Sequence, residues 1–317
     1  MNIIARFVVG AVGIGILLYL VTRVEWGAFL DSARDIRWGY LPLVYGLYAI
    51  SNIFRALRAR LFLPDAPFRN IFGIIGVQNA GNTFLPLRAG EFSYVYLVHQ
   101  GGIGHIGANI SSLLAGRVLD LLAICVIFAL SLLLLPTTAL PAPIFQSIFW
   151  SVLVLTAVIL CSIGLARWLA ALVRTFSERF HRHPRTERLL LLCADILTTL
   201  TDRRLLASLF VHSLGIWGMM FGAGALLLFV VGVPLAPASA AVAYAFPVFV
   251  SLTPLITFGG FGPYEGALTF ILLSFGVPEA VAIPASFILH ILELLFVAFF
   301  GLVSVWLLRS KAQNLAK

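Results

Sequence analysis

Two long tracts without a single Asp, Glu, Lys or Arg restrict the folds open to this chain. One runs between Asp120 and Arg167, and the other between Arg204 and Glu265. A helix needs about 20 apolar residues to cross a bilayer, so each tract holds two membrane segments joined by a turn. Only 11% of the 317 residues are charged, whereas soluble domains average about 25%. The sequence therefore predicts an all-α polytopic membrane protein, with residues 1–317 in a single integral membrane domain.

Apolar runs separated by charged or proline-containing turns predict about six crossings. The expected helices cover residues 3–21, 38–54, 108–135, 144–166, 205–231 and 279–308. The first helix resembles a signal peptide. We expect it to remain as an anchor, because no small-residue cleavage site precedes the charged stretch that follows it.

Basic residues predict which side of the membrane each loop faces, because cytoplasmic loops carry an excess of Lys and Arg. The loop after the second helix contains Arg55, Arg58, Arg60 and Arg69, and residues 167–204 contain eight arginines. Both loops, and both termini, are expected in the cytoplasm, at the inner face of a bacterial cytoplasmic membrane. The net charge of +8 is then explained by contact with anionic lipid and predicts no nucleic-acid partner. Residues 189–200 are expected to lie along the membrane surface.

Two stretches are too broken for simple crossings and too apolar for loops. Residues 70–100 contain Pro86 and Gly90, and residues 238–275 contain Pro247, Pro254 and the glycine-rich segment 259–266. Irregular backbone at membrane depth is tolerated where protein or water shields it. Both stretches are therefore predicted to be re-entrant broken-helix hairpins, which enter and leave the membrane on one side.

With both stretches re-entrant, each half of the chain crosses three times, so the halves, residues 1–136 and 144–311, have opposite orientations. Inverted repeats of this kind place a site near the midplane. A weak internal match supports the repeat, because Glu91 aligns with Glu265 and Arg117-x-x-Asp120 aligns with His290-x-x-Glu293. Chance alignment of apolar sequence is the alternative.

Charged and polar side chains within these apolar segments are the candidate substrate-binding residues, since ionisable groups at membrane depth usually face a cavity or each other. The candidates are Arg88, Glu91, Arg117, Asp120, Asn82, Tyr264, Glu265, His290 and Glu293. The structural alternative is that Arg117 with Asp120, and His290 with Glu293, pair along one helix face at i,i+3 and only stabilise packing.

Arg88 is the residue expected to hold an anionic headgroup, because a guanidinium fork matches phosphate oxygens and a helix start after Gly90 adds N–H donors. Its alternative role is to pair with Glu91 or with a backbone carbonyl. The carboxylates Glu91 and Glu265 are candidates for proton or cation coupling. Asn82 and Tyr264 are expected to satisfy backbone groups freed by the breaks.

Enzymatic readings find little support. The histidines have no metal-ligand spacing, and the Gly-x-Ser-x-Gly and P-loop motifs are absent from the sequence. We therefore expect no catalytic residue, no metal and no cofactor.

Three motifs resemble the lysylphosphatidylglycerol synthase transmembrane-region family. They are residues 79–91 (NAGNTFLPLRAGE), residues 116–120 (GRVLD) and residues 259–265. The resemblance covers nearly the whole chain and implies an integral membrane lipid translocase, as in the flippase part of the multiple peptide resistance factor. The chain departs from the family in two ways. It has no soluble aminoacyl-transferase domain, so it is not expected to make lysyl-lipid. In addition, His290 stands where the family pattern suggests arginine.

Together these features predict a lipid flippase or lipid transporter, which binds an anionic or polar headgroup in a central cavity between the two hairpins. One alternative is a non-transporting scaffold or accessory partner of an envelope lipid-synthesis enzyme. Another is a proton- or cation-coupled small-solute transporter. A third, an intramembrane enzyme, would use Glu91 and Glu265 as acid and base. The sequence leaves the lipid, the direction of movement and the oligomeric state open.

Overall fold

The protein is described here by a computed structural model covering residues 3–85, 89–101, 106–136, 138–180, 184–233, 235–252 and 258–315. Within these ranges the chain is helical and contains no strand. The helices are α1 (Ile3–Arg23), α2 (Trp26–Arg34), α3 (Leu41–Arg60), α4 (Phe68–Phe84), α5 (Gly90–Gln100), α6 (Ile106–Leu133), α7 (Ala142–Ser177), α8 (Pro184–Thr199), α9 (Arg203–Val230), α10 (Pro237–Leu252), α11 (Pro263–Ser274) and α12 (Glu279–Leu315). The predicted all-α class is confirmed.

The six helices α1, α3, α6, α7, α9 and α12 lie where the sequence predicts six crossings. By length and composition, the described residues contain 4 helices able to cross a membrane, α6, α7, α9 and α12. A fifth arises if α1 and α2, which are bent by 86° at their junction, form one span. Helix α3 has 20 residues, enough for about 30 Å, but Asn52, Arg55 and Arg58 make it more polar than the others.

Arg55 and Arg58 were expected in a cytoplasmic loop, and that prediction is wrong. Both residues lie on α3, which continues to Arg60, and Arg58 reaches inward to Asp120 on α6. A buried carboxylate compensates a guanidinium that would otherwise be costly inside an apolar bundle, so the helix need not end where the charges begin.

The expected cytoplasmic loop after residue 166 is also more ordered than predicted. Helix α7 continues to Ser177 and is followed by α8, which packs back against α7. Arg174 and Asp195 join the two helices with a 3.4 Å ion pair. Leu172 and Phe176 continue the apolar pattern of α7 at helical spacing, which explains why the helix runs on.

Both broken stretches form pairs of helices that pack against each other, α4 with α5 and α10 with α11. In the first pair the backbones meet at two glycines, since a Cβ on Gly81 would lie 2.8 Å from the Cα of Gly90. In the second, Gly259, Gly260 and Gly262 adopt φ of 61°, 81° and 93°, a left-handed conformation that favours glycine. Whether the pairs are re-entrant stays a prediction, as do the inverted halves.

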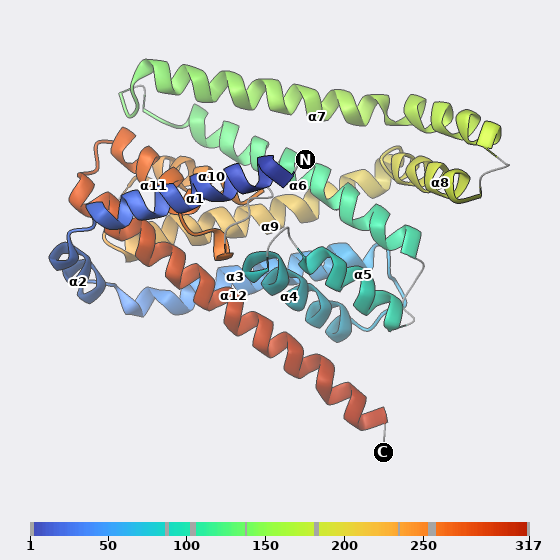
Figure 1. Ribbon diagram of the computed structural model, residues 1–317, viewed down its shortest axis with the longest axis horizontal. Helices are drawn as coiled ribbons and strands as arrows, with labels where there is room; N and C mark the ends of the chain where they lie inside the picture. The colour runs from blue at the N-terminus through green and yellow to red at the C-terminus, as the bar shows by residue number, and fades with distance from the viewer. Residues whose placement is uncertain are drawn as a thin grey trace.

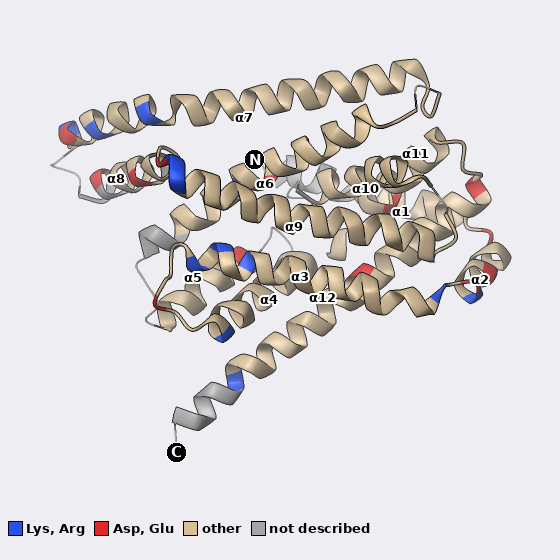
Figure 2. Ribbon diagram, turned by 180° about the vertical axis from the view of Figure 1, so that it is seen from behind, with Lys and Arg blue, Asp and Glu red and all other residues tan. Residues whose placement is uncertain are grey.

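The helices form a bundle in which α3 packs along α9, and α4 packs against α12 (Figure 1). Helix α7 lies along one side of the bundle, and the C-terminal end of α12 extends away from it (Figure 1). Most of the length of the long helices carries no charge, whereas basic residues gather where α7 ends and α9 begins (Figure 2). The few internal charges therefore stand out, and they surround a cavity.

Candidate binding cavity

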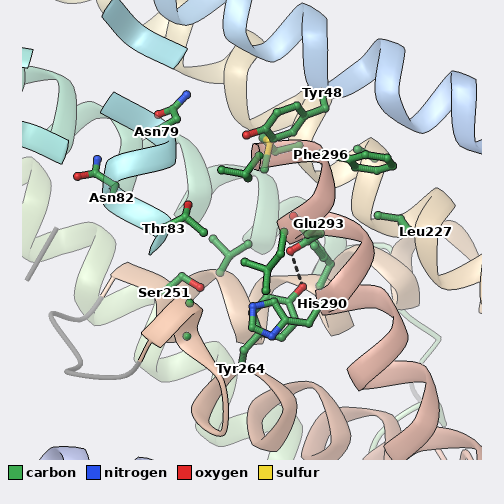
Figure 3. A pocket seen from close by; sticks show the side chains of 18 of the residues that line it. Tyr48, Asn79, Asn82, Thr83, Leu227, Ser251, Tyr264, His290, Glu293 and Phe296 are labelled. Atoms are coloured by element: carbon green, nitrogen blue, oxygen red, sulfur yellow. Dashed lines mark hydrogen bonds between the residues drawn. The ribbon is translucent and has the colours of Figure 1, made fainter. Parts of the chain in front are cut away.

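A cavity of about 250 Å³ lies inside the bundle. Its walls come from α3, α4 and α6 of the first predicted half and from α9 to α12 of the second. Asn79, Asn82 and Thr83 extend from α4 on one side, and Tyr264, His290 and Glu293 lie on the other (Figure 3). The broken hairpins bring these polar groups together, because α4 ends, and α11 begins, beside the cavity.

A smaller cavity of about 40 Å³ shares Arg55, Asn79 and Arg117 with the first. Asp120 and Arg58 also line it. Four charged side chains from α3 and α6 thus border this smaller space, and two of them, Arg55 and Arg117, also face the larger cavity.

Asp120 is bonded directly to one other helix, and through its partner to a second. Arg58 of α3 binds both of its carboxylate oxygens, and the same guanidinium donates a hydrogen bond to Ser213 of α9 over 2.7 Å. The Asp120 side chain is 2% exposed. A two-pronged contact of this kind is strong and directional, so Asp120 fixes α3 against α6 and α9.

Arg117 does not pair with Asp120, although the two are three residues apart on α6. Its Nη2 donates a hydrogen bond to Oε1 of Glu91, at the start of α5, over 2.8 Å. Both side chains are partly exposed. The contact joins the second arm of the first hairpin to the next long helix.

His290 forms a corresponding contact in the second half. Its Nδ1 lies 2.6 Å from Oε1 of Glu265, which is fully buried near the start of α11. The other oxygen of Glu265 accepts the backbone N–H of Gly262 over 2.7 Å, which caps the helix start. The Tyr264 ring stacks on His290 with centroids 4.0 Å apart and planes 9° apart. The broken segment is thereby fastened to α12.

Glu293 faces the cavity one turn beyond His290, and its hydrogen-bond donor is neutral. The Tyr264 hydroxyl donates to its Oε2 over 2.8 Å (Figure 3), and Tyr244 of α10 lines the same cavity. In the described part of the chain, no Lys or Arg lies within ion-pair distance of this carboxylate.

Arg55 is the complementary case on α3. Its guanidinium lies 5.6 Å from the centre of the Trp217 ring, an attractive cation–π arrangement. Among the described residues, no carboxylate lies at ion-pair distance from Arg55. The nearby carboxylates Asp120 and Glu91 are paired with Arg58 and Arg117. Among the described residues, this group has three arginines, Arg55, Arg58 and Arg117, and two carboxylates, Glu91 and Asp120.

Two polar atoms beside the cavity are buried without a partner in the described residues, Oδ1 of Asn82 and Nε1 of Trp217. Buried polar groups are almost always hydrogen-bonded in proteins. An acceptor beside Trp217 and a donor beside Asn82 would satisfy both atoms, as expected if a polar ligand enters.

The predicted site residues fall into three groups. Asn82, Arg117, Tyr264, His290 and Glu293 line the cavity. Glu91, Asp120 and Glu265 hold other charged groups in place. Arg88, on which the headgroup prediction relied, lies outside the described residues. The alternative in which each i,i+3 pair neutralises itself is wrong. Arg117 and Asp120 bond residues of other helices and not each other, and the same holds for His290 and Glu293.

Among the cavity residues that sequence reasoning missed are Arg55, Tyr48, Trp217 and Tyr244. A signal for two of them was present. Tyr48, Asn52 and Arg55 recur at intervals of four and three residues, which places polar groups on one face of an otherwise apolar helix. Trp217 and Tyr244 carry no such signal, because aromatic residues are common in membrane helices.

The model of the family described as "Lysylphosphatidylglycerol synthase TM region" matches residues 3–301. The chain belongs to this family. No curated protein and no solved structure matches the chain. The match includes all the residues that line the cavity. The family places the protein among membrane proteins related to lipid handling.

Proposed function

We propose that the protein is a lipid transporter of the flippase type, which admits a lipid headgroup to the central cavity while the acyl chains stay in the bilayer. The observation that carries this proposal is Arg55, a cation on the cavity wall without a carboxylate partner among the described residues. A guanidinium matches phosphate oxygens in shape and charge, and the phosphate is the group that most membrane lipids share.

The size of the cavity supports a headgroup as its occupant. Sites for drug-sized ligands usually measure about 300–1,000 Å³, so a space of about 250 Å³ suits a small polar group and excludes two acyl chains. Asn79 and Asn82 add amide groups to the same wall.

The pairing of the charges supports a moving part on each side of the cavity. Glu91 bonds Arg117, and Glu265 bonds His290, so residues aligned by the predicted repeat make equivalent contacts. In each half, the second arm of a hairpin is tied to the long helix that follows. Two equivalent hairpins facing one site form the arrangement that alternating access uses in repeat transporters.

The test is lipid translocation in vesicles reconstituted with the purified protein, using headgroup-labelled lipid and a membrane-impermeant quencher. Arg55→Gln is expected to slow translocation about tenfold or more, because losing one charged hydrogen bond costs about 1.5–3 kcal/mol. Arg60→Gln is the matched control. Arg60 is exposed on the same helix and outside the cavity, so the parent rate is expected.

Parent-like translocation by Arg55→Gln would show that the cavity is not the lipid path. No translocation by the parent, with any lipid tested, would contradict the transport proposal and favour the accessory-partner alternative.

A further inference from the structure

The part of the cavity wall that carries Glu293 differs in chemistry from the arginine group. Four aromatic side chains from four helices line the same cavity, Tyr48, Tyr244, Tyr264 and Phe296, and the Tyr264 hydroxyl contacts Glu293 directly. Figure 3 shows the Tyr264 hydroxyl at the Glu293 carboxylate, with Tyr48 and Phe296 further along the cavity wall. Tyr48 and Phe296 are neighbours, with ring centroids 6.5 Å apart. This part of the wall, from here on the aromatic pole, combines aromatic rings with one carboxylate.

The charge of the aromatic pole is not balanced by a neighbouring arginine or lysine of the described chain. The hydroxyl of Tyr264 donates a hydrogen bond to Glu293 and carries no positive charge. His290, the nearest basic side chain on the same helix, is bonded to Glu265. A cation entering the cavity would therefore meet an uncompensated carboxylate.

Aromatic faces around a carboxylate are a recognised environment for ammonium groups, because the ring quadrupoles attract a cation and the carboxylate adds direct charge. Arg55, whose preferred partner is a phosphate, lines the same cavity. Arg55 and Glu293 stay apart, with no ion pair between them among the described residues. The cavity thus has a cationic pole and an anionic pole.

We infer that the cavity recognises a zwitterionic headgroup, with its phosphate at Arg55 and its ammonium group at Glu293 within the aromatic pole. The inference rests on the proposed function, since it names the lipid class that the transporter takes. Phosphoethanolamine and phosphocholine headgroups have this chemistry, whereas a phosphoglycerol headgroup has the phosphate alone.

Binding to the full-length protein in detergent tests the inference without requiring transport. The probes are glycerophosphoethanolamine, glycerophosphocholine, glycerophosphoglycerol and inorganic phosphate, measured by isothermal titration calorimetry. The two ammonium-bearing probes are expected to bind at least about tenfold more tightly than glycerophosphoglycerol, a difference of about 1.4 kcal/mol. Equal affinities overturn the inference. If inorganic phosphate binds as tightly as glycerophosphoethanolamine, free phosphate is the ligand, and the inference is overturned as well.

The variants assign the preference to the aromatic pole. Glu293→Gln is expected to remove the tenfold preference while glycerophosphoglycerol binds as before. Glu279→Gln, an exposed carboxylate at the start of the same helix, is expected to keep it. Phe296→Leu, which removes one ring face at similar volume, is expected to weaken the ammonium-bearing probes several-fold and provides the readout if Glu293→Gln fails to fold. If Glu293→Gln and Phe296→Leu both keep the parent preference, or if the only one that folds keeps it, the inference is wrong.

Failure of transport and failure of the inference give different results. A protein that binds zwitterionic headgroups but moves no lipid in vesicles contradicts the proposed transport and supports the headgroup assignment. A protein that moves phosphatidylglycerol as fast as phosphatidylethanolamine, with Glu293→Gln unchanged, supports transport and overturns the assignment.

Discussion

At the residue scale, Asp120 is a buried carboxylate held by a two-pronged ion pair. Its two oxygens accept hydrogen bonds from Arg58, and Arg58 also donates one to Ser213. The Asp120–Arg58 pair therefore links α3, α6 and α9. Removing one partner of a buried ion pair leaves the other charge unsatisfied, and that cost exceeds the stability that the pair adds. The consequence is a test of structure that is separate from the tests of binding.

Asp120→Ala is expected to lower the free energy of unfolding by about 3 kcal/mol or more, because Arg58 is left buried without its carboxylate. The measurement is equilibrium chemical unfolding in detergent micelles. Asp31→Ala is the control, since Asp31 forms an exposed pair with Arg34 at 3.5 Å and such pairs contribute about 0.5 kcal/mol or less. Equal losses for the two variants would mean that the Asp120 pair has no structural role.

At the scale of elements, the close packing of α4 against α5 depends on Gly90. A Cβ on Gly90 would collide with the carbonyl oxygen of Gln78 and the backbone nitrogen of Asn82. Backbone atoms cannot move aside as a side chain can, so the two arms approach this closely only where both residues at the contact are small. The hairpin thereby places Asn79 and Asn82 on the cavity wall.

Gly90→Ala is expected to destabilise the protein by about 1–3 kcal/mol through overpacking, measured as a fall in the thermal unfolding midpoint in detergent. Gly46→Ala on α3 is the matched control, because a Cβ there meets no atom within 4 Å and alanine favours the helix by up to about 1 kcal/mol. A midpoint for Gly90→Ala at or above that of the parent would contradict the close approach.

The positions of the long helices follow from the sequence, because apolar length and proline-bounded turns are local properties. The ends of α3 and α7 do not, since Arg55, Arg58 and Arg167 indicate loops when they are seen without their tertiary surroundings. Asp120, which makes Arg58 acceptable inside the bundle, is 62 residues away. The same limit applies to the site. Rare internal charges identify Arg117, His290 and Glu293 on the cavity wall, whereas the partner of each charge depends on packing.

The whole molecule has a topology that the charge distribution predicts and that labelling can test. With the described cysteines Cys125, Cys161 and Cys193 replaced, single cysteines are introduced at Thr138 and Asp65, which are exposed in opposite predicted loops. A membrane-impermeant maleimide is expected to label Thr138→Cys in intact spheroplasts and Asp65→Cys only after lysis. Labelling of both positions before lysis, or the reverse order, would overturn the predicted orientation.

Helix α7 has 36 residues and therefore a length of about 54 Å, whereas the apolar core of a bilayer is about 30 Å thick. Several turns must extend beyond the core, and α8 folds back along them. Because α8 also packs against α6, which carries Arg117 and Asp120, this overhanging part of the molecule is mechanically connected to the cavity wall. Cys193 is an exposed thiol on α8 and offers a native attachment point for a fluorescent or spin probe. Because α8 packs against α6, a probe at Cys193 is placed to report movements of α6.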